Sequence, residues 1–244
     1  RTINSISIIY LNLFILLTFM IDFNDLISNY LKRESKEKQI GKYYPSEAGS
    51  CLRKLFYSYK IPKSINQELI KIFEVGNLLH DFVTKDIESE KNPHIELLET
   101  EVPFKLEINN IIISGRIDNI VLLKINGIIY IVEIKSTSSL QHTEKPNLSS
   151  ILQLQLYMHF KKIHNGLILY IEKNTLNTKT FEIKYNQEQA QLAIDRLLAI
   201  HSYLINNKLP EPEAKLDEEM LWQCKFCDYQ EECENNHLVS PKEL

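Results

Sequence analysis

Three charged residues stand in a part of the chain that is otherwise rich in isoleucine and valine. Asp118, Glu133 and Lys135 flank an Asn126-Gly127 pair, which is typical of a two-residue β-hairpin turn. In that register Asp118 faces Lys135, and Glu133 lies diagonally from Asp118 on the same face, at about 7–8 Å between backbone positions. Two such carboxylates can hold one metal ion, which would offset the cost of burying Glu133 in an apolar strand. An exposed strand face with an Asp–Lys pair is the alternative.

The four cysteines are the second group with chemical potential. Cys51 stands alone near the start, whereas Cys224, Cys227 and Cys233 lie together near the end. A zinc ribbon usually contains two Cys-x-x-Cys pairs, and this chain has one pair followed five residues later by a third cysteine. That spacing suits a [4Fe–4S] cluster bound by four thiolates, with zinc and unligated thiols as alternatives. A cluster would join the N-terminal helical part to the C-terminal tail.

Residues 8–21 form an apolar run of 14 residues, shorter than the roughly 18–20 needed to span a bilayer. Only Arg1 precedes the run with a positive charge and no small-x-small cleavage site follows, so it does not fit a secretory signal. Three interpretations of this segment stay open. It is an artefact of start-site assignment, with Met20 as the working start, or a membrane or interfacial anchor, or a packed N-terminal segment. Without an export signal we expect the reducing cytoplasm, where cysteines are more often metal ligands than disulfides.

Composition places the chain among ordinary globular proteins. It has 244 residues, of which 44% are hydrophobic and 25% charged, and a net charge of −4. These values exclude disordered and collagen-like chains. A slightly acidic protein does not coat nucleic acid through bulk charge, so any such contact should be a local basic channel. The candidate phosphate contacts, each with a solvated surface charge as the alternative, are Arg53, Lys54, Lys60, Lys63, Arg116, Lys161 and Lys162.

The spacing of apolar residues predicts the elements that carry these groups. Helices are expected to begin near Asp22, at Pro45 with Ser46 as N-cap, and over about 66–90. From about residue 95 the period changes to two. The expected elements from there on are strands at 101–108, 111–124 and 128–136, a helix at 149–163, strands at 167–172 and 179–185, and a helix at 187–206.

This order predicts an α+β fold with a mixed central β-sheet flanked by helices. Four parts are expected along the chain. They are an apolar N-terminal segment (1–21), a helical N-terminal part with the first cysteine (22–94), a core (95–207) and a cysteine-bearing tail (208–244).

Taken in order along the chain, the candidate site residues resemble the motifs of the RecB-type branch of the PD-(D/E)XK nucleases, whose core is restriction-endonuclease-like. That branch has a Gly-x-x-x-His, an Asp, a Glu-x-Lys and a Gln-x-x-x-Tyr motif in this order. One early and three late cysteines, with a Cys-x-Arg at Cys51, narrow the resemblance to the small iron–sulfur members, the CRISPR-associated "Cas four" exonucleases. The matching residues run from Cys51 to Cys233 and include Gly76 to His80, Asp118, Glu133-Ile134-Lys135 and Gln153 to Tyr157.

The resemblance implies a divalent metal site. Asp118, Glu133 and the backbone carbonyl of Ile134 would be oxygen ligands for Mg²⁺ or Mn²⁺, and His80 would be a further ligand that favours Mn²⁺. Lys135 would orient or deprotonate the attacking water, or stabilise the developing charge on the phosphate. Without the resemblance, His80 would be interpreted as a hydrogen-bonded core histidine.

The remaining matched residues have implied roles beside the metal. Gln153 and Tyr157 are one helical turn apart and would line the active site and position the DNA strand. A solvated glutamine and a packed tyrosine are the alternatives. The four cysteines would bind the [4Fe–4S] cluster, whose role would be mainly structural.

The function implied is a metal-dependent exonuclease that acts on single-stranded DNA and trims spacer precursors for CRISPR integration. The implied partners are DNA, the proteins of the integrase complex and, as an option, further copies of the chain. One alternative is a general repair or viral RecB-like nuclease. The other is a non-catalytic iron–sulfur DNA-binding subunit, which would have no use for Asp118, Glu133 and Lys135 together.

Overall fold

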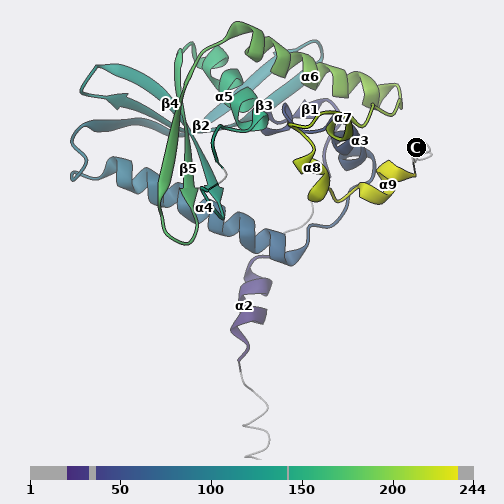
Figure 1. The fold of residues 1–244 in the computed structure, drawn as a ribbon, viewed down its shortest axis with the longest axis horizontal. Helices are drawn as coiled ribbons and strands as arrows, with labels where there is room; N and C mark the ends of the chain where they lie inside the picture. The colour runs from purple at the N-terminus through teal and green to yellow at the C-terminus, as the bar shows by residue number, and fades with distance from the viewer. Residues whose placement is uncertain (1–20, 33–36, 142, 236–244) are drawn as a thin grey trace, which may run out of the picture.

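A mixed β-sheet forms the centre of the protein, and helices cover both of its faces (Figure 1). The computed structural model describes residues 21–32, 37–141 and 143–235, so the expectations for residues 1–20 lie outside it. In these residues the sheet has six strands in the order β1-β3-β4-β5-β6, with β2 paired to β3. The strands are β1 (Lys42–Tyr43), β2 (Ile95–Ile108), β3 (Ile111–Leu123), β4 (Ile128–Thr137), β5 (Asn165–Glu172) and β6 (Thr178–Lys184).

Both parallel and antiparallel pairs occur, which confirms the predicted α+β class. β3 pairs antiparallel with β2 and with β4, whereas β4 and β5 run parallel. The parallel pair needs a crossover, and α5 (Leu148–Lys161) supplies it. α5 packs on β4 and β5 on one face of the sheet, and α6 (Gln187–Ile205) packs over α5. α4 (Gln67–Glu88) crosses the opposite face.

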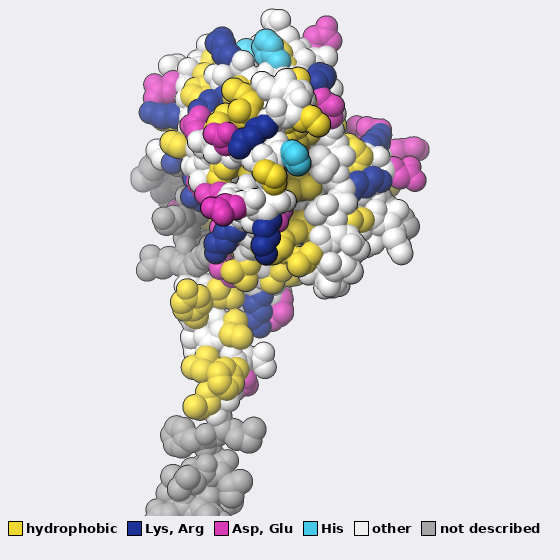
Figure 2. Space-filling model, turned by 90° about the vertical axis from the view of Figure 1, so that its left-hand side faces the viewer, with side chains coloured by type: hydrophobic (Ala, Val, Ile, Leu, Met, Phe, Trp, Pro, Cys, Tyr) yellow, Lys and Arg dark blue, Asp and Glu magenta, His cyan; other side chains and the backbone are white. Residues whose placement is uncertain are grey.

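The segment from Pro45 to Lys60 and the C-terminal tail meet at one end of the sheet (Figure 1). A 3₁₀ turn (Pro45–Glu47) leads to α3 (Leu52–Lys60), beside which lie α7 (Glu213–Leu216), α8 (Trp222–Lys225) and α9 (Gln230–Glu234). By contrast, α2 (Phe23–Tyr30) extends away from the sheet with exposed hydrophobic side chains (Figure 2). Among the residues described, no helix is long and apolar enough to cross a membrane.

The hairpin between β3 and β4 differs from the predicted register. Leu123 pairs with Ile128, so the loop contains four residues, 124–127, and the expectation of a two-residue turn was wrong. The side chain of Asn126 accepts a hydrogen bond from the N–H of Ile128, and Gly127 adopts φ +67°, so local turn chemistry closes the longer loop. The two-residue shift preserves the face on which each side chain lies.

Two helix predictions also need correction. Ser46 is not an N-cap, because Pro45–Glu47 forms a separate 3₁₀ turn and α3 begins only after Cys51. In α4 the sheet covers the second half of the helix, where Leu79 and Val83 are buried. The helical spacing of apolar residues also predicts an inner side for this helix, but five of the side chains it includes are exposed, namely Leu69, Ile72, Phe73, Leu78 and Phe82.

Candidate active site

β3 and β4 part at the position where the predicted acidic residues lie. Their ladder ends at the pair Asn119 and Val132, and the next positions along the two strands are Asp118 and Glu133. Asp118 therefore lies opposite Glu133, not opposite Lys135 as the two-residue turn predicted. Beyond the ladder, Oδ2 of Asp118 accepts a hydrogen bond from the backbone N–H of Ile134 at 2.8 Å. This bond fixes the Asp118 carboxylate in the gap between the strands.

Glu133 is a buried carboxylate with one unused oxygen. Its side chain is on the α5 side of β4 and the residue is only 1% exposed. Oε1 lies 2.6 Å from Nζ of Lys135, but Oε2 has no hydrogen-bond partner among the described residues. Burial and the charge of Asp118 raise the pKa of Glu133 to about 7, against the opposing effect of Lys135. A buried carboxylate oxygen without a partner is unfavourable, and a divalent metal ion beside Glu133 would supply one, so these residues fit such an ion.

His80 reaches the same gap from α4, on the other face of the sheet. Its Nδ1 lies 3.6 Å from Oδ1 of Asp118, and its side chain is partly exposed. Burial lowers the pKa of His80, but the nearby carboxylates of Asp118 and Glu133 outweigh burial and raise it. Gly76, one turn earlier, allows α4 to approach the sheet, since an added Cβ would lie 3.3 Å from Oγ of Ser136.

The metal ligands that were predicted lie together, but as side chains they do not form a complete metal cage. No three His, Cys, Asp or Glu residues in the described ranges are arranged so that they would hold an ion by themselves. The side chain of Ile134 is fully buried, which leaves only its backbone for a role at the site. Ligation by the carbonyl of Ile134 and by His80 therefore stays a prediction.

A chain of hydrogen bonds connects Lys135 to α5. Nζ of Lys135 donates to Oε1 of Gln153 at 3.0 Å, and Nε2 of Gln153 donates to the hydroxyl of Tyr157 at 3.2 Å. The hydroxyl of Tyr157 in turn donates to the carbonyl of Arg116 at 2.8 Å. Burial and the charge of Glu133 raise the pKa of Tyr157, so its proton is retained. Both ends of the Gln153 amide are used inside the protein, which favours holding Lys135 over contacting DNA.

A groove of about 300 Å³ opens beside Asp118 and His80. Pro45 packs near Gly115 on its wall, where an added Cβ on Gly115 would lie 3.1 Å from the proline ring. Arg116 is largely exposed at the groove and pairs with Glu101 at 2.6 Å. The other residues that line the groove are Tyr44, Ser46, Asn77 and Tyr157.

Two residues that the sequence analysis missed join α4 to β3 below the carboxylates. Asn119 is fully buried, and Oγ1 of Thr84 lies 3.1 Å from its Nδ2 and 3.2 Å from its Oδ1. A lone asparagine directly after Asp118, inside a run of isoleucine and valine, was the signal that could have found it.

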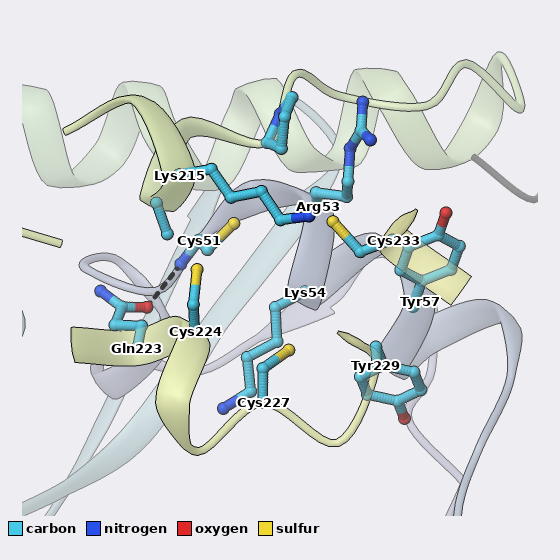
Figure 3. Close-up of a pocket in the computed structure, with 12 residues that line it drawn as sticks. Cys51, Arg53, Lys54, Tyr57, Lys215, Gln223, Cys224, Cys227, Tyr229 and Cys233 are labelled. Carbon is cyan, nitrogen blue, oxygen red and sulfur yellow. Dashed lines mark hydrogen bonds between the residues drawn. The ribbon is translucent and has the colours of Figure 1, made fainter. Parts of the chain in front are cut away.

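All four cysteines line a second cavity at the junction of α3 with the tail (Figure 3). All are free thiols. Burial and the neighbouring Cys51 and Cys233 raise the pKa of Cys224. The structure thus brings together residues from the two ends of the chain, as a shared ligand would require.

The cavity is held together by polar contacts that do not involve sulfur. The side chain of Gln223 accepts a hydrogen bond from the N–H of Cys51 at 2.9 Å (Figure 3). It also donates to the carbonyl of Gly49 at 3.0 Å. Arg53 is 7% exposed and donates to the carbonyl of Pro210, so the expectation that Arg53 contacts phosphate was wrong. Its guanidinium stabilises the tail instead.

Comparison with solved structures shows that SSO0001 has the same fold. SSO0001 has a TM-score of 0.62 at 21% identity, over 88% of this chain and 100% of that chain. A phage-related exonuclease from Haemophilus somnus 129PT has a TM-score of 0.47 at 13% identity, over 68% and 94%. The alkaline exonuclease LHK-Exo from Laribacter hongkongensis has a TM-score of 0.42 at 13% identity, over 73% and 96%. No curated protein matches the sequence.

The sequence itself matches a family description. The PD-(D/E)XK nuclease superfamily matches residues 77–234, which is more than half of the chain. The match spans the gap between β3 and β4, the helix α5 and the last three cysteines. Because of this match, and because β3 and β4 separate where Asp118 and Glu133 lie, the chain belongs to the PD-(D/E)XK nuclease superfamily.

Proposed function

We propose that this protein is a metal-dependent exonuclease that hydrolyses single-stranded DNA. The observation that carries the proposal is the unpaired, buried Oε2 of Glu133 beside Asp118. PD-(D/E)XK nucleases generally use Mg²⁺ or Mn²⁺, and carboxylate oxygens are the ligands these ions prefer. Asp118 and Glu133 would hold the ion, with His80 at its edge. When bound, the ion would supply charge neutralisation on the phosphate and an activated water.

Lys135 provides a positive charge at the same place. Burial lowers the pKa of Lys135, but Glu133 and Asp118 outweigh burial and hold it above its usual range. The ammonium therefore donates hydrogen bonds instead of accepting a proton. Of the roles considered for Lys135, orienting the attacking water and stabilising the phosphate charge fit a protonated amine.

The groove supplies contacts suited to a single strand. The aromatic ring of Tyr44 is 39% exposed on its wall, and exposed rings stack on unpaired bases. Arg116 offers a guanidinium for a phosphate once Glu101 releases it. Since the whole chain carries a net charge of −4, binding would depend on this local surface and on the metal.

We further propose that Cys51, Cys224, Cys227 and Cys233 bind a [4Fe–4S] cluster. Support comes from the four free thiols, which line one cavity at the junction of α3 with the tail (Figure 3). A cluster binds each of four thiolates at a different iron, so it would use all four residues that this cavity brings together. The cluster would hold the tail against α3.

The biological task we propose is the trimming of spacer precursors during CRISPR adaptation, in a complex with the integrase proteins. Support comes from the combination of the nuclease motifs with one early and three late cysteines. The test is to add the purified protein to integrase with overhanging precursors. Trimming to integration length supports this task, whereas a repair nuclease would digest without regard to the integrase.

The nuclease activity has a direct test. End-labelled single-stranded DNA is incubated with wild type, Asp118→Ala and Asp81→Ala, in Mn²⁺, in Mg²⁺ and in chelator. We expect wild type to shorten the strand only when metal is present. Asp81→Ala, which changes an exposed residue and serves as the control, should behave like wild type. Asp118→Ala should not shorten the strand under any of these conditions. Equal cleavage by Asp118→Ala at matched purity would refute the assignment of the site.

A further inference from the structure

The contact between Thr84 and Asn119 lies in an apolar environment. Asn119 is fully buried, and Val132 lies directly across from it on β4. The same face carries Val121, Val132 and Ile134, packed against Leu79 and Val83 of α4. An amide buried among such residues costs about 1–3 kcal/mol if it lacks a partner, and the hydroxyl of Thr84 is the partner here.

An apolar pair at these two positions would pack without that cost. It would specify the rotation and register of α4 less strictly, because apolar contacts are non-directional. A hydrogen bond between a helix and a strand fixes one rotation and one register of the helix. The polar pair is therefore better explained by what it positions than by the stability it adds.

What it positions is His80. Gly76, His80 and Thr84 follow one another at intervals of one turn on the same face of α4. Gly76 brings the first of these turns close to Ser136 of β4, and Thr84 binds the last to Asn119 of β3. His80 lies between these two fixed points, and Asn119 directly follows Asp118, the residue that His80 approaches.

We propose that Thr84 and Asn119 are positioning residues that set the distance between His80 and the Asp118 carboxylate, and thereby the affinity of the site for a divalent cation. This inference rests on the proposed function, because it takes His80, Asp118 and Glu133 as the surroundings of that cation. Neither Thr84 nor Asn119 contacts the ion. They act through the helix and the strand that carry its ligands.

The test is a double-mutant cycle read out by Mn²⁺ titration calorimetry on the full chain without DNA. The variants are Thr84→Val, which has the same shape without the hydroxyl, Thr84→Ser, which keeps the hydroxyl, His80→Ala, and the double variant His80→Ala/Thr84→Val. We expect Thr84→Val to weaken Mn²⁺ binding about tenfold, as loss of a residue that orients a ligand does, and Thr84→Ser to bind like wild type. In the His80→Ala background, Thr84→Val should cause no further loss.

The outcomes distinguish failure of the proposed function from failure of the positioning role. If wild type binds no Mn²⁺, the proposed function fails. If wild type binds but His80→Ala has no effect, or if the losses from His80→Ala and Thr84→Val add in full, the positioning role is overturned while the carboxylate site stands. Unfolding curves of each variant without metal show whether it is folded. Should Thr84→Val not fold, Thr84→Ala removes the same hydroxyl and enters the same cycle.

Discussion

The ammonium of Lys135 lies 3.0 Å from the amide oxygen of Gln153, one residue on β4 and the other on α5. The same ammonium lies 2.6 Å from Glu133, so it is held between a carboxylate and an amide. Gln153 is in turn held by Tyr157. The Gln-x-x-x-Tyr spacing therefore has a physical reason, since residues one helical turn apart can form one continuous chain of hydrogen bonds to the lysine.

Removing the Gln153 amide should impair the chemical step more than DNA binding. Gln153→Ala is expected to lower kcat about 10- to 100-fold with little change in KM, because Lys135 loses its fixed orientation. The measurement is steady-state cleavage of end-labelled DNA. The matched control is Gln155→Ala, since Gln155 is buried two residues away but bonds to Lys184 and Asn186 and not to Lys135. A fall in kcat of the same size in both variants would contradict this role.

Gly49 should tolerate no side chain. An added Cβ would lie 2.3 Å from the backbone Cα of Ser149 at the start of α5, so the two segments would have to separate. Gly49→Ala is expected to lower the free energy of unfolding by about 1–3 kcal/mol. Urea unfolding measures the change. Ser46→Ala, which shortens an exposed side chain on the same segment, should unfold like wild type, and an unchanged midpoint for Gly49→Ala would disprove the close packing.

Replacing one cysteine should release the tail as well as the proposed cluster. Cys227→Ser is expected to lose most of its iron and its brown colour after anaerobic purification, and to become less soluble, because the cavity loses one of four thiolates. Iron analysis and the visible spectrum measure this. A colourless wild type that contains zinc would overturn the cluster.

The sequence was sufficient for the fold class and for the grouping of the acidic residues. Alternation in β3 and β4 placed Asp118 and Glu133 on one face for a two-residue loop and for a four-residue loop alike, because a shift of two residues preserves the face. It was insufficient for the register itself. The side-chain bond from Asn126 to Ile128 closes a four-residue loop, and the Asn126-Gly127 pair alone does not distinguish this loop from a two-residue turn.

Other features depended on tertiary contacts that no local pattern contains. The expected N-cap at Ser46 failed because Glu47 binds the N–H of Tyr44 and the hydroxyl of Tyr59, which closes a separate turn. Helical spacing in α4 correctly showed an amphipathic helix but not how far the sheet extends beneath it. Asn119 and Thr84 are 35 positions apart, so no local sequence pattern predicts their contact, which forms only because α4 packs on β3.

We expect Asp118 and Glu133 to hold a divalent cation together. The most direct measurement is thermal unfolding of the full chain with increasing Mn²⁺, for wild type, for Glu133→Gln and for the control Glu101→Gln, whose carboxylate lies in the groove but pairs with Arg116. Saturating metal at about 100 times its Kd should stabilise wild type and the control by about 2.7 kcal/mol. No stabilisation of Glu133→Gln is expected, and stabilisation of all three proteins to the same extent would contradict the binding of a cation by these two carboxylates.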